Sequence, residues 1–439
     1  MHAGAFVVGL DPLDPSVNAA TAVGDLVAAR ARLSAAAGGL GITSAVATSQ
    51  HAFLGSLCLT AHLVKSALGA TVPDEAAVAA ALPDLAAAVS ANAFAAVPSL
   101  ASATLTDLVT APFVHAQRKL ARATGKAAAD AVLRRIADPA AAAWFLSGQE
   151  DGATFLIAYP EFGGGINDLQ FTTLVKARLG LRIVPALEQP EQCPACSGHK
   201  SGTGILDPKN TTLRPDGLHA LHCHESGRGG LMGFTSSRHA HLKFTVIEVL
   251  QRFLPKTAEV AKVEPSSSTY YPFKNDKNTD IRNDIAVTID GVTTLCDTVV
   301  SHPNPVVQPL VATVAGTAAQ LAFQQKQTMY NNTFVIPTGH MVPLSAETGG
   351  RLHADFKGFV KRCVARGLAD AGSRETEWTD ATRVLFSSRM RSALVTINIA
   401  IARSVSSALI RGSTVLARYG ALHTGPLGAA PAAAPAGGG

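Results

Sequence analysis

The chain has 439 residues, enough for two or three domains, and it is 47% hydrophobic, so it can bury an apolar core. Its formal net charge of +5 permits a polyanionic partner without requiring one. Six cysteines, three of them close together, argue against a disulfide framework, and the N-terminus lacks the basic start of a signal peptide. These features predict an intracellular protein, nuclear or cytoplasmic, that is not secreted.

Residues 1–150 have the apolar spacing of helices, most clearly over residues 23–33 and 50–68. Between these two helices, the glycine-rich segment 38–42 predicts a tight turn that ends the first helix. The segment is a weak candidate for a phosphate-binding loop, because no Lys-Ser/Thr pair follows it. We expect residues 151–190 to form a linker that contains an amphipathic helix over residues 169–181.

Residues 191–237 are rich in Gly, Ser, His and Pro, and they carry a candidate metal site. Cys193 and Cys196 form one close pair, and His219 and Cys223 form a second. Two such pairs can complete the tetrahedral coordination of zinc. Because the segment has too few apolar residues to build a core, we expect a structural zinc ion to order it. Three further histidines are alternative ligands: His199, His222 and His224.

Residues 238–365 switch between helix and strand patterns. A helix is predicted over 239–253, a short strand over 260–263, and two strands over 284–289 and 293–301 that flank an Asp-Gly turn. A long helix should follow over residues 306–330. The fold class is therefore α+β or α/β, with a small mixed sheet flanked by helices.

Further helices are expected from about residue 354 to residue 418, with residues 366–420 as a C-terminal helical region. Two apolar stretches, 306–323 and 392–410, approach the length of a membrane span. Both contain polar side chains, including Gln320 in the first and Arg403 in the second, so we interpret them as buried helices. Residues 421–439 are rich in Pro, Ala and Gly and predict a disordered tail.

Asp284 and Asp297 are the strongest catalytic candidates. If Asp290 and Gly291 form a two-residue hairpin turn, strand residues pair outwards from it one by one. Asp284 lies six residues before Asp290, and Asp297 lies six residues after Gly291, so the two carboxylates should face each other. Adjacent carboxylates repel, and a divalent cation such as Mg²⁺ relieves that repulsion in sites that cleave phosphodiesters.

The order of three other residues along the chain fits the same site. Glu264 lies at the end of the short strand, and Lys326 and Tyr330 lie one turn apart on the long helix. A lysine there can orient the attacking water or stabilise the charge on the phosphate. Taken singly, each of these residues also fits an ordinary role at the end of a strand or on a solvated surface.

Taken in order, these features resemble the region downstream of the polymerase in non-LTR retrotransposons that carry a restriction-enzyme-like endonuclease. The resemblance rests on the following segments in chain order: the glycine segment 38–42 followed by residues 45–57, residues 174–181, the Cys193, Cys196, His219 and Cys223 set with Gly217 and Ala220, Arg238-His239, Glu264-Pro265, Arg282 with Asp284 and Ile285, Asp297, Lys326 with Tyr330, and Pro343 with Glu347, Thr348 and Gly350.

The resemblance implies a PD-(D/E)xK nuclease fold at 238–365, a zinc knuckle at 191–237, and a thumb-like or linker region at 1–150. It also implies Mg²⁺-dependent nicking of DNA, with DNA or RNA as partner and no membrane. Asp284 and Asp297 would hold Mg²⁺, with Glu264, Lys326 and Tyr330 as the other catalytic residues. Four residues would contact nucleic acid: Arg238, His239, Lys243 and Arg282.

Two departures from the resembled pattern favour an alternative. Asn283 stands where a proline precedes the first aspartate, and Thr298 follows Asp297 where an apolar residue is usual. The alternative is a catalytically inactive remnant of a reverse-transcriptase polyprotein that binds nucleic acid. A third hypothesis is a decayed open reading frame with no selected activity.

Overall fold

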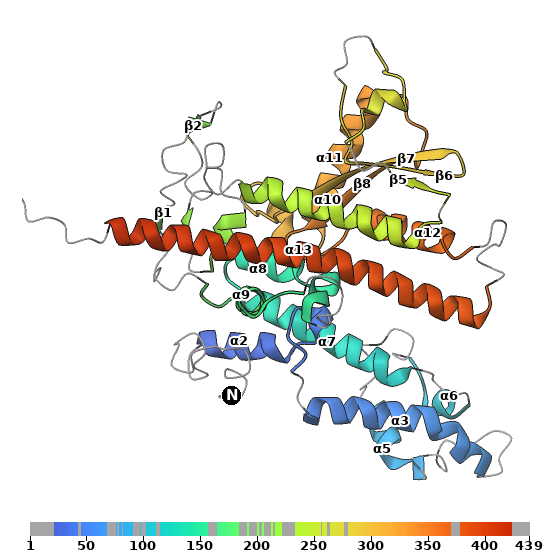
Figure 1. The fold of residues 1–439 in the computed structure, drawn as a ribbon. Coiled ribbons are helices and arrows are strands. Elements are labelled where there is room, and N and C mark those ends of the chain that lie inside the picture. The colour runs from blue at the N-terminus through green and yellow to red at the C-terminus, as the bar shows by residue number, and fades with distance from the viewer. Residues whose placement is uncertain are drawn as a thin grey trace, which may run out of the picture. The chain divides into compact units, whose positions relative to one another are not determined.

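The computed structural model of the chain is mixed α+β, with many helices and one small four-stranded sheet (Figure 1). It describes residues 22–42, 45–67, 82–90, 102–110, 115–156, 165–183, 216–221, 233–255, 257–260, 264–275, 280–369 and 378–423, with short pieces at 76, 79–80, 97, 191–192, 200–201, 204–205 and 212–213. Two compact units are present, Ala22–Ala137 and the residues from Asp138 onwards. The first of these units ends just before the helix that starts at Pro139.

The first unit is helical, as expected. Its elements are α2 (Ala22–Arg32), the 3-10 helix η2 (Ala35–Ala37), α3 (Ala45–Ala67), α5 (Pro83–Ser90), α6 (Leu105–Thr110) and α7 (Ala116–Arg135). The glycine turn after α2 is confirmed, because Gly38 and Gly41 have φ angles of 97° and 75°. Cys58, Leu85 and Leu108 are fully buried in the apolar core between α3, α5 and α6.

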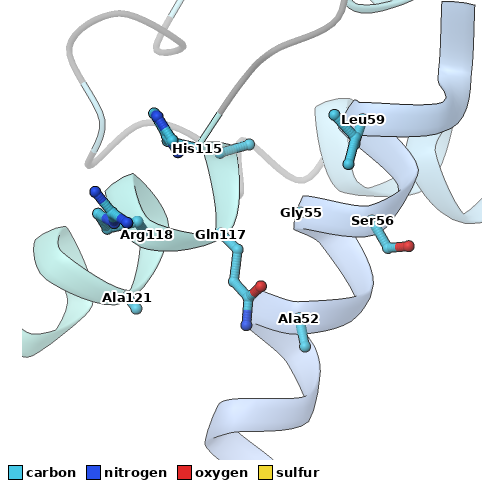
Figure 2. Close-up of a pocket in the computed structure, with 9 residues that line it drawn as sticks. Ala52, Gly55, Ser56, Leu59, His115, Gln117, Arg118 and Ala121 are labelled. Atoms are coloured by element: carbon cyan, nitrogen blue, oxygen red, sulfur yellow. The ribbon is translucent and has the colours of Figure 1, made fainter. Parts of the chain in front are cut away.

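Helices α3 and α7 are in close contact at Gly55. A Cβ atom on Gly55 would lie 2.5 Å from the Cβ of Gln117 and 2.8 Å from its Cα. Figure 2 shows these two residues on the adjoining helices, beside an open pocket of about 650 Å³. Only glycine therefore fits at this crossing.

Replacing Gly55 by alanine should destabilise the first unit although alanine favours helices. Overpacking against the Gln117 backbone costs about 1–3 kcal/mol, against a gain in helix propensity of about 1 kcal/mol. Gly125→Ala on α7 is the matched control, because the nearest atom to its added Cβ, Ser34 Oγ, is 4.0 Å away. Thermal unfolding should show a lower midpoint for Gly55→Ala and a higher one for Gly125→Ala. Equal shifts would contradict the close crossing.

The helices of the second unit include most of those expected. They are α8 (Pro139–Ser147), η3 (Glu150–Leu156), α9 (Asp168–Leu179), η5 (Leu218–Leu221), α10 (Gly233–Phe253), η6 (Ser267–Thr269), η7 (Pro309–Ala312), α11 (Thr317–Thr333), α12 (Ala354–Arg366) and α13 (Asp380–His423). Two short antiparallel pairs lie between α9 and η5: β1 (Glu191–Gln192) with β4 (Thr212–Leu213), and β2 (Lys200–Ser201) with β3 (Gly204–Ile205).

The four-stranded sheet has the order β5-β6-β7-β8. Its strands are β5 (Glu259–Val260), β6 (Ile285–Ile289), β7 (Val292–Ser301) and β8 (Met341–Glu347). The first three pair antiparallel, and β8 pairs parallel with β7. Helix α11 packs against β7 and β8, while α10 and α12 also contact the sheet (Figure 1).

The turn between β6 and β7 has the predicted register. Ile289 pairs with Val292 and Ile285 with Cys296, which places Asp284 opposite Asp297 at the next position. Asp290 and Gly291 have φ angles of 50° and 77°, as a type I′ turn requires at both central residues. The expected strand over 260–263 is present only as β5, and residues 261–263 lie outside the described part of the chain.

The prediction of one long helix over residues 306–330 was wrong for residues 306–316. The helix α11 begins at Thr317, after Gly316, which has a φ of 83°, and residues 309–312 form only the short 3-10 helix η7. Pro309 has no N–H group for a helical hydrogen bond, and the positive φ of Gly316 is not helical, so α11 cannot extend towards the N-terminus past Thr317.

Helix α13 is the longest element, with 44 residues. Over Asp380–Thr414 it is long and apolar enough to cross a membrane, but 67% of its most apolar window is buried inside the fold. It packs against α9, α10, α12, η3 and η5. The interpretation of 392–410 as a buried helix is therefore confirmed. The helix continues to His423, past the expected start of the tail at 421, and the rest of the tail lies outside the described residues.

Candidate active site

The β6–β7 hairpin brings two buried aspartates to one place. Asp284 and Asp297 are 6% and 4% exposed. Asp284 Oδ2 accepts hydrogen bonds from the backbone N–H and the hydroxyl of Thr298, both at 2.6 Å. These bonds fix the first carboxylate against the strand that carries the second.

Helix α11 supplies two groups to Asp297. Lys326 Nζ lies 2.8 Å from Asp297 Oδ2, and the hydroxyl of Tyr330 donates to the same oxygen at 2.9 Å. Tyr330 is fully buried, in an apolar cluster that also contains Leu295 and Phe334. The helix is therefore anchored so that Lys326, one turn before Tyr330, reaches the carboxylate. This is the helix position that the sequence predicted for both residues.

Helix α10 supplies two groups to Asp284. His239 Nε2 lies 2.9 Å from Asp284 Oδ1, and Lys243 Nζ lies 4.0 Å from the same oxygen. Lys243 Nζ also lies 2.5 Å from Glu264 Oε1. Lys243 is buried, and its ammonium group connects the carboxylate of Glu264 to that of Asp284. Glu264 thus reaches the candidate site through a lysine and not through a direct contact with the aspartates.

The two aspartates differ in their electrostatic environment. Burial raises the pKa of Asp297, and the negative charge of Asp284 adds to this effect although Lys326 opposes it. Burial also opposes the ionisation of Asp284, but hydrogen bonds from His239 and Thr298 outweigh it, so the pKa of Asp284 is lowered. The hydrogen bond to Asp284 in turn raises the pKa of His239. Asp284 is therefore the more readily ionised of the two, and Asp297 binds its proton more tightly than a free carboxyl group does.

This donor set fits Mg²⁺. Mg²⁺ prefers oxygen ligands and is commonly held by one or two carboxylates, with water and substrate phosphate as its other ligands. No cluster of three or more His, Cys, Asp or Glu suited to a metal occurs within the described residues. Among the described residues, Asp284 and Asp297 are the carboxylates that would hold the ion, and His239 and Lys326 already lie against them.

The four residues expected to contact nucleic acid have different positions. His239 and Lys243 lie at the carboxylates, as described above. Arg282 is exposed, and its backbone carbonyl accepts a hydrogen bond from Tyr330. Arg238 is 3% exposed and donates to the carbonyl of Leu221 at 2.9 Å, and burial lowers its pKa to about 10. Arg238 therefore connects α10 to η5 and does not face solvent.

The expected zinc ligands Cys193, Cys196 and Cys223 lie outside the described residues. His219 lies in η5 and is 2% exposed. The neighbouring Ala220 occupies the space that a Cβ atom on Gly412 of α13 would need. The segment around His219 is thus packed on the body of the second unit, and the zinc site stays a prediction.

Sequence reasoning assigned Lys243 to nucleic acid and gave Thr298 and Glu347 no role in the site. The i, i+4 spacing of His239 and Lys243 on one helix could have indicated that both face the same partner. Glu347 is 2% exposed and accepts hydrogen bonds from the N–H groups of Ala318 and Ala319, at 3.1 and 3.3 Å. It therefore holds the start of α11, the helix that carries Lys326.

No family model, no curated protein and no solved structure matches this chain.

Proposed function

We propose that the chain is a Mg²⁺-dependent DNA endonuclease that nicks phosphodiester bonds, with a PD-(D/E)xK-like fold and an origin in a non-LTR retrotransposon. The observation that carries the proposal is the pair of opposed, buried aspartates, one of which is bonded to a lysine from a separate helix. The small mixed sheet with helices against it supports the same proposal. A structural zinc held by Cys193, Cys196, His219 and Cys223 belongs to it as well.

Each residue of the site has a defined task in this proposal. Asp284 and Asp297 hold Mg²⁺, which when bound polarises the phosphate and stabilises the charge that develops on it. Lys326 orients the attacking water, and its ammonium group lies near the charge that grows on the phosphate. Tyr330 fixes the position of Asp297, and Lys243 holds Glu264 beside Asp284.

A second candidate function is nucleic-acid binding without catalysis. It is favoured by the ion pairs within the site, since every carboxylate already has a basic partner from the protein. His239 pairs with Asp284, Lys326 pairs with Asp297, and Lys243 pairs with Glu264. Such pairs keep the site balanced in charge when no metal is bound.

Conversion of supercoiled plasmid to the open-circular form tests the proposal with the full chain. Nicking should appear when Mg²⁺ is added and should be absent when Mg²⁺ is omitted. Omission is better than chelation, because a chelator would also remove structural zinc. DNA binding that weakens steeply with salt, without any nicking, would select the second candidate.

Lys326→Ala should lower the nicking rate by about 100-fold, the effect expected when one electrostatic stabiliser of the transition state is lost. The matched control is Lys357→Ala. Lys357 lies 2.9 Å from Asp151 and is 31% exposed, against 2.8 Å and 33% for Lys326 with Asp297. Asp297 is more deeply buried than Asp151, so Lys326→Ala should cost more stability than Lys357→Ala, and the rates are compared at a temperature where thermal unfolding shows both variants folded. Similar rates in the two variants would remove Lys326 from the mechanism.

A further inference from the structure

A small pocket lies between α9, α10 and α13, outside the carboxylate site. Its lining includes Arg403 and Arg411 from α13 and His241 from α10. On α13 the spacing 403, 407, 411 repeats every four residues, so these side chains lie along one face of the helix. On α10 the spacing of Ser237 and His241 is the same. Two helices therefore direct polar and basic side chains into one small space.

The chemistry of the lining suits an anion. No aspartate or glutamate occurs among the described residues that line the pocket. Both Arg403 and His241 line the pocket, and burial lowers the pKa of His241, with a smaller contribution from the positive charge of Arg403. His241 is therefore neutral more readily than a free histidine, and Arg403 and Arg411 supply the positive charge of the lining.

One serine in the pocket is oriented for donation. Ser407 Oγ accepts a hydrogen bond from the side-chain amide of Gln170 at 3.1 Å. Because a hydroxyl that accepts one bond keeps its own hydrogen for another, Ser407 can donate to a ligand. Gln170 itself is held by the capping box at the start of α9, where it also accepts from the N–H of Asn167. The donor is thus fixed before any ligand arrives.

The size of the pocket limits the ligand. Its volume is about 120 Å³. That is roughly the liquid volume of four water molecules, and it is well below the 300–1,000 Å³ of sites for drug-sized ligands. A single phosphate group fits this space, whereas a nucleotide base or a larger ligand does not.

We infer that this pocket binds one phosphate group of a nucleic-acid strand. The inference rests on the proposed nucleic-acid partner, but not on nuclease chemistry. His241 lies two residues from His239, which contacts Asp284, so the pocket and the carboxylates lie on different faces of the same stretch of α10. A helix is about 10 Å across, and phosphates of one strand are about 3.4 Å apart along a duplex axis. The width of the helix therefore corresponds to a few nucleotides of one strand.

The test measures binding of a fluorescein-labelled 20-base-pair DNA to the full chain without added divalent metal, at several salt concentrations. Arg403→Gln should weaken binding about tenfold and lower the slope of log Kd against log salt by about one. Ser407→Ala should weaken binding about threefold and leave the slope unchanged, because it removes a donor but no charge. Arg403→Lys should keep the slope.

The matched control is Arg391→Gln, an exposed arginine on the same helix, twelve residues or about 18 Å before Arg403. It should change neither affinity nor slope. An equal loss in Arg391→Gln and Arg403→Gln would overturn the inference, because the effect would then belong to the general charge of α13. Unchanged binding in both Arg403→Gln and Ser407→Ala would overturn it too, provided that thermal unfolding shows both variants folded.

Two further probes separate the sources of phosphate. Inorganic phosphate and vesicles of phosphatidylserine with phosphatidylcholine should show little Arg403-dependent binding. A loss of vesicle binding with DNA binding intact would overturn the inference in favour of a lipid. Nicking that persists with Arg403-independent binding would reject the pocket and keep the nuclease. Arg403-dependent binding with no nicking would reject the nuclease and keep the pocket.

Discussion

Asp297→Asn is expected to lower the rate of Mg²⁺-dependent plasmid nicking by about three orders of magnitude or more. The substitution keeps the shape of the side chain but removes one of the two charges proposed to hold the ion. A metal contributes several kcal/mol to the stabilisation of transition-state charge, and each 1.36 kcal/mol corresponds to a factor of ten in rate. Asp284→Asn should have a similar effect, and the double variant Asp284→Ala, Asp297→Ala should be inactive.

DNA binding separates a catalytic loss from a general one. Removing a negative charge from a site that faces a polyanion does not weaken the attraction, so Asp297→Asn should bind DNA at least as tightly as the native chain. Asp290→Asn is the control within the same hairpin, because asparagine tolerates the positive φ of the turn and Asp290 lies at the other end of the strands. Nicking that survives in the double variant would end the assignment of this site.

Glu347→Ala should destabilise the second unit by about 3 kcal/mol. The change leaves the buried N–H groups of Ala318 and Ala319 without their acceptor, and each such loss costs about 1–3 kcal/mol. Glu347→Gln keeps an acceptor oxygen and should lose much less. Glu248→Ala, at an exposed glutamate of α10, should change stability by no more than about 0.5 kcal/mol. Urea unfolding measures all three, and equal losses in Glu347→Ala and Glu248→Ala would contradict the role of Glu347.

The pH dependence of stability gives an independent check on Glu347. Burial raises the pKa of Glu347 in the folded protein above its ordinary value of 4.5. The folded state then binds the proton more tightly than the unfolded state, so this residue contributes less stability as the pH rises from 4.5 through the raised pKa. Glu347→Gln should remove that decrease. A native chain and a Glu347→Gln variant with the same pH profile would show that the carboxylate is not held in this way.

Local patterns in the sequence were sufficient to predict the hairpin. The dipeptide Asp290-Gly291 specifies a turn with two positive φ angles, and pairing outwards from it places Asp284 opposite Asp297. The helix predicted over residues 306–330 likewise contained both Lys326 and Tyr330, although it begins only at Thr317. These features depend only on residues close together in the chain, so periodicity and turn chemistry could identify them.

Features that depend on distant contacts could not be predicted in the same way. Strand β8 contains Pro343 and alternates poorly, and it forms because it pairs in parallel with β7 across the intervening α11. The position of Lys243 depends on how α10 lies against the sheet, so its sequence was compatible with either a surface or a buried role. Glu347 acts on a helix that precedes it in the chain, and no spacing rule relates the two.

The hairpin also limits how the gene can vary. Twelve residues separate Asp284 from Asp297, and successive side chains in β6 and β7 point to opposite faces of the sheet. Many substitutions among these twelve residues would leave the two aspartates opposite each other. Inserting or deleting a single residue would instead turn one aspartate to the other face of the sheet. The length of this segment is therefore under stricter constraint than its composition.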